Sequence, residues 1–246
     1  MVGYVFGTGA AMSVRVAERK PRPRVGGAPT PRRPRLPVLT ATALIGTLVG
    51  SSTRIFGAGV FHALRRDPTK LAQGQLWRLI TPVLVQGDRS LLAIVGVFLL
   101  CGAIGVAGER MLPRTEWAAL YLIGALAGHG IGEVFQPHQS GMSVAFAAIL
   151  GGITAHVLLG RRRPRWPWRA RFAALVPLAV LDTALRDIHG VPLLAGLITG
   201  SVFELRSRAS SCTRSGRGLS APAGALTPDP RPCRRVRQST PTRKAQ

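Results

Sequence analysis

The sequence has few acidic residues, with 10 Asp and Glu against 33 Lys and Arg among 246 residues, so its formal net charge is +23. Aromatic residues are also scarce, at 6%, whereas 46% of the residues are apolar. One soluble globule does not combine so large an apolar fraction with so unbalanced a charge. The basic and the apolar residues must therefore lie in different parts of the chain.

Cysteine is scarce as well, and its placement excludes a disulfide scaffold. Cys101 lies in an apolar run, whereas Cys212 and Cys233 lie in the Arg-rich C-terminal part. We therefore expect free thiols. The first eleven residues lack the basic flank and the apolar length of a cleaved secretion signal, and Met12 is an alternative start. No export of the whole chain is expected.

The basic residues concentrate at the two ends of the chain. Residues 1–35 contain eight Lys and Arg and five Pro, and residues 205–246 contain ten Lys and Arg, five Pro and no aromatic residue. Such segments bury too little apolar surface to fold. The sequence predicts two disordered basic tails, 1–35 and 205–246, on either side of a folded domain over 36–204.

Apolar runs with little charge recur through that domain. A helix needs about 20 residues to cross the hydrocarbon core of a membrane, so we predict an all-α membrane protein with a bundle of six transmembrane helices. The runs are Leu36–Thr53, Leu91–Gly108, Trp117–Gly132, Ser143–Gly160, Phe172–Leu185 and Ile188–Phe203. The last two are short and contain polar groups, so four spans with two re-entrant segments remain the alternative.

The distribution of Lys and Arg indicates an orientation. With six spans, the tails and the second and fourth loops lie on one side, and they contain 26 of the 33 basic residues. Cytoplasmic segments carry an excess of Lys and Arg. We therefore expect a multi-pass protein, in the plasma membrane, with both termini in the cytoplasm.

A charge of +23 also raises the possibility of nucleic-acid binding. The basic tails, however, lack interleaved aromatic residues and any pattern of a groove-docking helix. Anionic lipid headgroups are the better partner, because each basic residue near such a surface contributes about 1 kcal/mol. We expect the tails to contact these headgroups and predict no nucleic-acid partner.

Two residues within the apolar runs have the chemistry of a nucleophile and its base. Ser143 begins the fourth run and His189 begins the sixth, so in the predicted orientation both lie at the outer face. A serine hydroxyl needs an adjacent base to attack a carbonyl. Taken singly, a serine at a helix start is commonly an N-cap and a histidine at a helix end is commonly interfacial.

Short motifs surround these two residues in a fixed order. Trp77 and Arg78 lie within the stretch Gly74–Pro82, Gly105 and Glu109 close the second run, Gly141 and Gly151 flank Ser143, and Gly196 and Gly200 follow His189. Over roughly residues 74–200, this pattern resembles the rhomboid intramembrane serine proteases.

The resemblance implies a reaction and its residues. Ser143 would be the nucleophile and His189 the general base of an endopeptidase that cleaves transmembrane proteins near the outer membrane face. Trp77, Arg78, Glu109 and the four glycines Gly141, Gly151, Gly196 and Gly200 would be motif or structural residues. No cofactor and no metal would take part.

The sequence departs from the family pattern at several positions. Val144 stands where a glycine usually follows the serine, and Pro192 replaces the first glycine after the histidine. The second helix of the family carries a His and an Asn that stabilise the oxyanion, and counting back from Glu109 puts Ala93 and Val97 there. Gln86 replaces a loop histidine; its side chain has the chemistry of a substitute donor, but a solvated loop residue is the simpler expectation. A catalytically inactive homologue that binds transmembrane segments is therefore the alternative function.

Further polar residues near the outer face have two interpretations each. Asp182 and Asp187 precede His189 and have the chemistry to orient its ring as in a triad, but pairing with Arg186 is the simpler expectation. His129, Glu133 and His138 are spaced closely enough to suggest a metal, yet no second ligand cluster supports them. We interpret these three as residues of the outer face without a metal.

Overall fold

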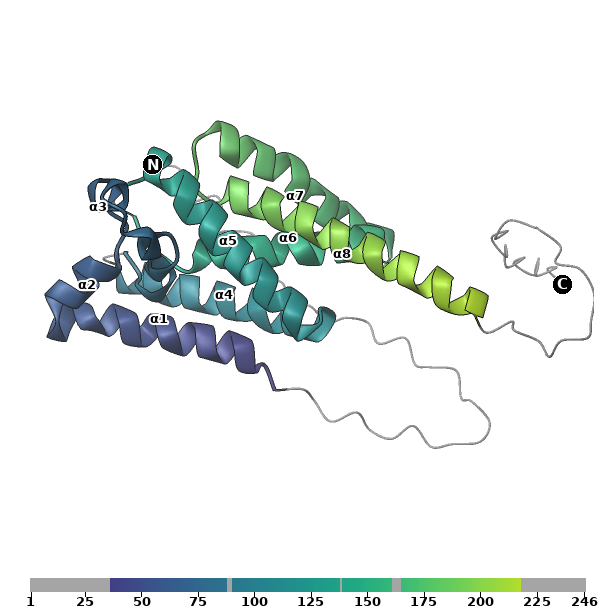
Figure 1. The fold of residues 1–246 in the computed structure, drawn as a ribbon, viewed down its shortest axis with the longest axis horizontal. Coiled ribbons are helices and arrows are strands. Elements are labelled where there is room, and N and C mark those ends of the chain that lie inside the picture. The colour runs from purple at the N-terminus through teal and green to yellow at the C-terminus, as the bar shows by residue number, and fades with distance from the viewer. Residues whose placement is uncertain (1–35, 88–89, 138, 161–164, 218–246) are drawn as a thin grey trace, which may run out of the picture. The chain divides into compact units, whose positions relative to one another are not determined.

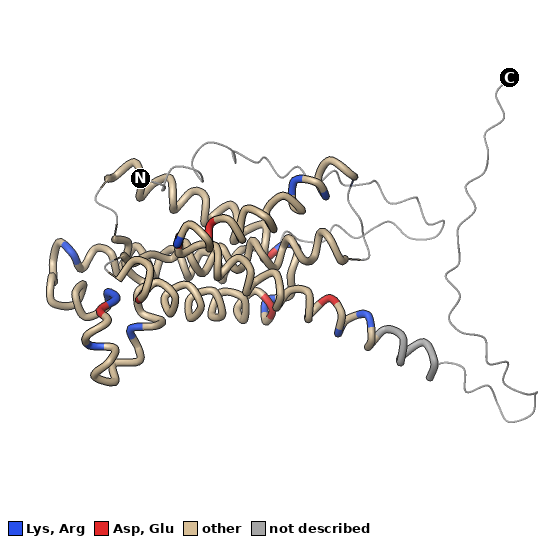
Figure 2. The backbone as a smooth tube through the Cα atoms, turned by 90° about the horizontal axis from the view of Figure 1, so that it is seen from above, with Lys and Arg blue, Asp and Glu red and all other residues tan. Residues whose placement is uncertain are grey.

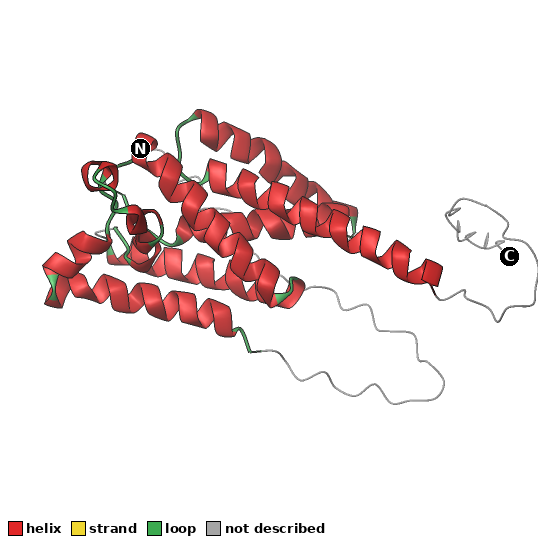
Figure 3. Cartoon of the chain, in the orientation of Figure 1, coloured by secondary structure: helices red, strands yellow, loops and turns green. Residues whose placement is uncertain are grey.

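The computed structural model describes residues 36–87, 90–137, 139–160 and 165–217, and side chains as far as residue 210. These residues form helices and loops, with no strand among them (Figure 3), so the all-α prediction is confirmed for them. The elements, labelled in Figure 1, are α1 (Val38–Phe56), α2 (Ala58–Leu64), α3 (Pro68–Ala72), η1 (Leu76–Leu79), η2 (Thr81–Leu84), α4 (Leu91–Met111), α5 (Arg114–Phe135), α6 (Ser143–Leu159), α7 (Trp166–Ala184) and α8 (Gly190–Arg217).

The six predicted runs correspond to α1 and to α4 through α8. Among the described helices, α1, α4 and α5 are long and apolar enough to cross a membrane, and α6 is apolar but shorter. The count of six spans, and the alternative with two re-entrant segments, therefore stay predictions. Most of the described chain carries no charged residue, as the tan tube in Figure 2 shows.

Two of the long helices expose large apolar side chains on their surface. The exposed residues include Ile45, Leu48 and Val49 on α1 and Leu92 and Leu99 on α4. In water such surfaces would favour aggregation, whereas lipid tails solvate them without cost. The exposed faces of α1 and α4 are thus suited to contact with lipid.

Helix α6 is the most deeply buried element. Its apolar residues are enclosed along almost its whole length, from Val144 to Val157, and it packs against α4, α5 and α7. Phe146 contacts both Trp117 and Tyr121 of α5 edge to face. A helix that is apolar on all sides belongs in the interior of a bundle.

Helices α6 and α8 approach each other very closely. A Cβ added to Gly151 would overlap the carbonyl oxygen of Leu193, and one added to Gly196 would overlap the carbonyl of Ala148. Glycine therefore allows the two backbones to touch, as small residues do in membrane bundles. This contact determines how residues at the start of α8 lie relative to the start of α6.

Polar contacts hold the same two helices together near both ends. Ser143 at the start of α6 contacts His189, the residue before α8, with 2.9 Å between Oγ and Nε2. Farther along, His156 Nδ1 lies 2.5 Å from Glu204 Oε1. The two helices therefore run parallel and in a fixed register.

Glu109 ties the end of α4 to the start of α1. Its Oε1 accepts the backbone N–H of Thr40 at 2.6 Å, and its side chain is buried. N–H groups in the first turn of a helix lack intrahelical partners, and a carboxylate there also interacts favourably with the helix dipole. Glu109 thus has a structural role at the end of the bundle away from Ser143.

Arg78 organises the loop between α1 and α4. The guanidinium is buried and donates from Nη1 to the carbonyl oxygens of His62 and Arg65, at 3.1 and 2.6 Å, and from Nε to Gln75 at 2.8 Å. These bonds satisfy carbonyls at the end of α2 that have no partner within the helix. The adjacent Trp77 is about half exposed.

The C-terminal boundary differs from the predicted one. The sequence predicts a tail from residue 205, but α8 continues to Arg217. Residues 205–217 contain no proline, so no residue forces the helix to end. Of the predicted tails, residues 1–35 and 218–246 lie outside the described residues. The chain divides into the units Met1–Ser207 and Arg208–Gln246, and the sites discussed below lie in the first.

Replacing Gly196 by alanine is expected to destabilise the protein by about 1–3 kcal/mol, because the new methyl group must push α8 away from α6. Gly96→Ala is the matched control, since a Cβ there meets no atom within 4 Å and removing a helix glycine stabilises by roughly 0.5–1 kcal/mol. Unfolding in a denaturing detergent titration measures both. Equal midpoints for the two variants would contradict the close approach.

Candidate active site

Ser143 is the first residue of α6 and presents its hydroxyl to His189. The N-cap of the helix is Met142, and no side chain makes a capping hydrogen bond. Ser143 is therefore not an N-cap, the common role of a serine at a helix start. Its Oγ instead lies 2.9 Å from Nε2 of His189, within the reach required of a nucleophile and its base.

His189 contacts a carboxylate on its other side. Nδ1 lies 2.7 Å from Oδ1 of Asp187, and the same oxygen accepts the backbone N–H of His189 at 2.8 Å. Burial raises the pKa of Asp187, but the hydrogen bonds and charge of His189 outweigh it and bring that pKa below its usual value. An ionised carboxylate only accepts hydrogen bonds. Nδ1 therefore carries the proton, and in the neutral ring the lone pair of Nε2 faces Ser143.

A specific turn at the end of α7 places Asp187. The N–H of Asp187 donates to the carbonyl of Asp182 at 2.8 Å, and the N–H of Arg186 donates to that of Thr183 at 3.1 Å. Together with a left-handed residue at Arg186, with φ of 58°, this is the Schellman arrangement that ends many helices. A glycine usually occupies the left-handed position, and here an arginine does.

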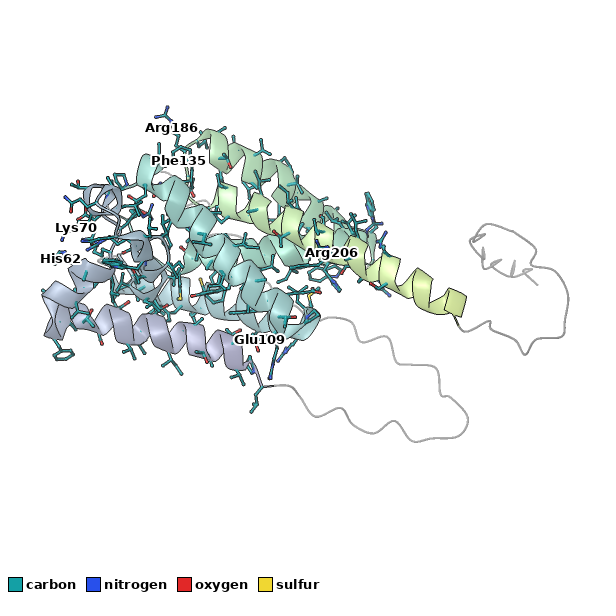
Figure 4. The ribbon with its side chains drawn as sticks, viewed as in Figure 1. His62, Lys70, Glu109, Phe135, Arg186 and Arg206 are labelled. Carbon is teal, nitrogen blue, oxygen red and sulfur yellow. The ribbon has the colours of Figure 1, made fainter. Side chains whose placement is uncertain are left out.

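The expected pairing of the aspartates with Arg186 is wrong for Asp187. Asp187 pairs with His189, and among the described residues no ion pair joins Arg186 to either aspartate. The physical reason is the left-handed backbone at Arg186, which reverses the chain there; Figure 4 shows the Arg186 side chain pointing away from the helices. Sequence spacing alone did not distinguish the two partners.

Val144, which follows the nucleophile, does not point toward His189. Its side chain is fully buried against α5, where a Cβ added to Gly128 would lie 2.5 Å from the Cβ of Val144. Gly128 has no side chain, and the Val144 side chain occupies the space that this leaves against α5. The valine that replaces the family's usual glycine therefore fits between α5 and α6.

The loop before α4 reaches the segment that precedes Ser143. The N–H of Gly87 donates to the carbonyl of Ser140 at 2.9 Å, and the N–H of Gln86 donates to Oγ of Ser51 at 2.9 Å. The buried side chain of Gln86 lies against Gly141, since a Cβ added there would be 2.9 Å from Gln86 Oε1. The amide therefore lies beside the backbone two residues before the nucleophile.

Helix α4 offers no side-chain donor to this site. Its sequence contains neither His nor Asn, and of the two positions derived from Glu109, Ala93 is exposed and Val97 packs against the apolar core. Any hydrogen bonds to a developing oxyanion must therefore come from elsewhere. The first-turn N–H groups of α6 are one source, because helix N-termini favour negative charge.

His129 and Glu133 both belong to α5, and His138 lies outside the described residues. The ring of His129 is completely buried, and Arg66 of the loop after α2 lies near both side chains. Burial lowers the pKa of Arg66 to about 10, although the charge of Glu133 raises it. No group of three or more potential metal ligands occurs among the described residues.

The motif residues lie at four places in the structure. Gly141 lies beside the nucleophile, and Gly151, Gly196 and Gly200 line the contact of α6 with α8, where a Cβ on Gly200 would lie 2.8 Å from the Cα of Gly152. Trp77 and Arg78 belong to the loop, and Glu109 is remote. In Figure 4, Arg186 and Phe135 lie toward the same end as His62 and Lys70, whereas Glu109 and Arg206 lie toward the other.

The sequence is similar to proteins of a known family. Residues 73–206 match the Rhomboid domain family. The chain is also 31% identical to the rhomboid protease GluP of Bacillus subtilis (strain 168) over 115 residues, which are 46% of this chain and 22% of that relative. The chain thus spans well under two thirds of that relative's length. With the apolar helices, the family match makes this chain an integral multi-pass membrane protein.

Changing Arg186 to glycine is expected to stabilise the protein by about 1 kcal/mol, because glycine adopts the left-handed conformation without steric cost. Ala184→Gly is the matched control in the last turn of α7 and should destabilise by roughly 0.5–1 kcal/mol. The midpoint of thermal unfolding in mild detergent measures both changes. If both glycines destabilise equally, the left-handed turn at residue 186 does not exist.

Proposed function

The chain belongs to the rhomboid family, and we propose that it is an intramembrane serine endopeptidase that uses Ser143 as nucleophile and His189 as general base. The observation that supports the proposal most directly is the 2.9 Å contact between Ser143 Oγ and His189 Nε2. Ser143 begins α6 and His189 immediately precedes α8, 46 positions later, so no local turn of the chain brings the two side chains together.

The reaction would proceed through an acyl-enzyme. Oγ of Ser143 attacks the carbonyl carbon of the scissile peptide bond while Nε2 of His189 takes the hydroxyl proton. The tetrahedral intermediate collapses with loss of the C–N bond, and Nε2 returns the proton to the leaving amine. Water then attacks the ester carbonyl while Nε2 takes its proton; the C–O bond to Ser143 Oγ breaks, and Nε2 returns the proton to Oγ.

Stabilisation of the oxyanion would differ from that of the family. The backbone N–H groups in the first turn of α6 supply donors, and the amide of Gln86, which lies against Gly141, supplies a further one. Loss of one oxyanion donor typically costs about 10²–10³ in kcat. We therefore expect a slower enzyme than one that retains the His and the Asn.

The proposed substrates are transmembrane proteins cut near the outer membrane face. This follows if residues 36–204 form a six-span rhomboid-like domain with both termini in the cytoplasm of a plasma-membrane protein, because α6 and α8 then both begin on the outer side. The basic residues at the two ends of the chain, before residue 36 and from residue 205 onward, would contact anionic headgroups on the cytoplasmic side.

One observation favours a second function, that of a catalytically inactive homologue that binds transmembrane segments. Helix α4 has Ala93 and Val97 where oxyanion donors are expected, and it contains no His or Asn at all. In that case the dyad would be dispensable for the cellular role, and helix packing at Gly196 would be essential. The preserved Ser143–His189 contact is the reason to place the protease first.

Wild-type protein in detergent should react with a fluorophosphonate probe, and Ser143→Ala should abolish the labelling, because only an activated serine attacks phosphorus at a useful rate. His189→Ala should reduce labelling by several orders of magnitude. Ser201→Ala, which removes an α8 hydroxyl bonded to Leu197, is the control and should label normally. Cleavage of a reporter transmembrane substrate should follow the same order.

If folded wild-type protein neither labels nor cleaves, the protease proposal is wrong. Full activity in Ser143→Ala would exclude Ser143 as the nucleophile.

The natural cysteines test the orientation. In intact cells, a membrane-impermeant maleimide should not label wild-type protein. Cys212 and Cys233 belong to the proposed cytoplasmic C-terminal region, and Cys101 is buried. Permeabilisation should allow labelling. Arg186→Cys is the matched control and should label in intact cells. Labelling of wild-type protein before permeabilisation would refute a cytoplasmic C-terminus.

A further inference from the structure

We propose that Asp187 is the third member of the site and positions His189 for catalysis, so that the reacting group is a Ser143–His189–Asp187 triad. The inference rests on the proposed protease function and extends it, since the family resemblance implies a dyad alone. Asp187 does not touch the substrate in this proposal. It acts through the imidazole ring.

The geometry has the connectivity of a triad. Asp187 Oδ1 lies 2.7 Å from Nδ1 of His189, and on the other side of the ring Nε2 lies 2.9 Å from Ser143 Oγ. The carboxylate therefore selects the tautomer with a proton on Nδ1. It also compensates the positive charge that the ring acquires when it takes the serine proton.

The backbone holds the carboxylate firmly in this position. The Schellman turn fixes Asp187 through its N–H bond to Asp182, and the left-handed residue before it is an arginine, which is strained there. Non-glycine residues in this conformation persist where the surroundings determine them, and they concentrate at functional sites. Side chains of Asp187 and His189 are only 20% and 26% exposed, so solvent screens the pair weakly.

A purely structural role for Asp187 must be distinguished from this one. The bond from the His189 N–H to Oδ1 is also the pattern of an Asx turn, which would place an aspartate here without any catalytic purpose. Asp187→Asn separates the two roles. The amide oxygen still accepts the backbone N–H and preserves the turn, whereas the negative charge beside the ring is lost.

The matched control is Asp182→Asn. Asp182 is the other acidic group close enough to His189 for a charge interaction, but its carboxylate makes no hydrogen bond to the ring, and its role in the turn uses only its backbone carbonyl. Among the described residues, the charged groups recorded near His189 are Asp187, in the turn before α8, and Asp182 of α7, and the Ser143 hydroxyl of α6 contacts its ring. A nonspecific effect of removing negative charge would be similar in both variants.

The experiment measures cleavage of a reporter transmembrane substrate against pH for wild type and both variants in liposomes. Asp187→Asn should lower kcat on the order of 10²–10⁴-fold, the range expected when a triad carboxylate is removed, with KM nearly unchanged. The acidic limb of its kcat/KM profile should move to lower pH, because the protonated ring loses its compensating charge. Asp182→Asn should remain within about twofold of wild type. Equal effects of the two variants, or a change in KM alone, would overturn the proposal.

A spectroscopic measurement keeps this inference separate from the protease function. In protein labelled with ¹⁵N-histidine, the ring of His189 should show the Nδ1–H tautomer at neutral pH in the Ser143→Ala background, and Asp187→Ala should abolish that preference. This result does not depend on turnover, so it decides the role of Asp187 even if no substrate is cleaved. Persistence of the tautomer in Asp187→Ala would overturn the proposal, whereas absence of cleavage by wild type counts only against the protease.

Discussion

The direct backbone contact between α6 and α8 is the constraint on which the rest of this structure depends. Gly151 and Gly196 have no side chains, so Gly151 of α6 lies directly against the carbonyl of Leu193, and Gly196 of α8 lies against that of Ala148. Because the helices are parallel, the contact brings their first residues to the same end of the bundle. A methyl group at this interface would push the two helices apart, because it would overlap backbone atoms of the facing helix.

The connections at the ends of these helices complete the site. The turn after α7 presents Asp187 to one nitrogen of the His189 ring, while the start of α6 presents Ser143 to the other. The loop before α4 adds Gln86 beside Gly141. These groups come from three different parts of the chain, and each of them lies close to the start of the buried helix α6. Rigid elements that carry reacting groups on their ends are an effective way to preorganise a site.

Much of this arrangement could be predicted from the sequence. Apolar runs separated by charged loops predicted the helices, because a helix that faces lipid or protein on all sides can contain few charges. The order of motifs predicted the family, and Ser143 and His189 were chosen because their runs begin on the same side. One helix boundary could not be predicted. The end of α8 at Arg217 depended on a helix that continues through polar residues, and such residues are compatible with either helix or tail.

The sequence by itself determined which segments become helices and which two residues could act as nucleophile and base, because both follow from local composition and from position along a span. Only the tertiary structure decided the partner of His189. Asp182, Arg186 and Asp187 all lie within seven residues of it, and their spacing allows several pairings. The left-handed backbone at Arg186 selects one of them, and the contact of α8 with α6 then points the other ring nitrogen at Ser143. The first pairing depends on the conformation of the turn and the second on how α8 packs against α6, and residue spacing alone specifies neither.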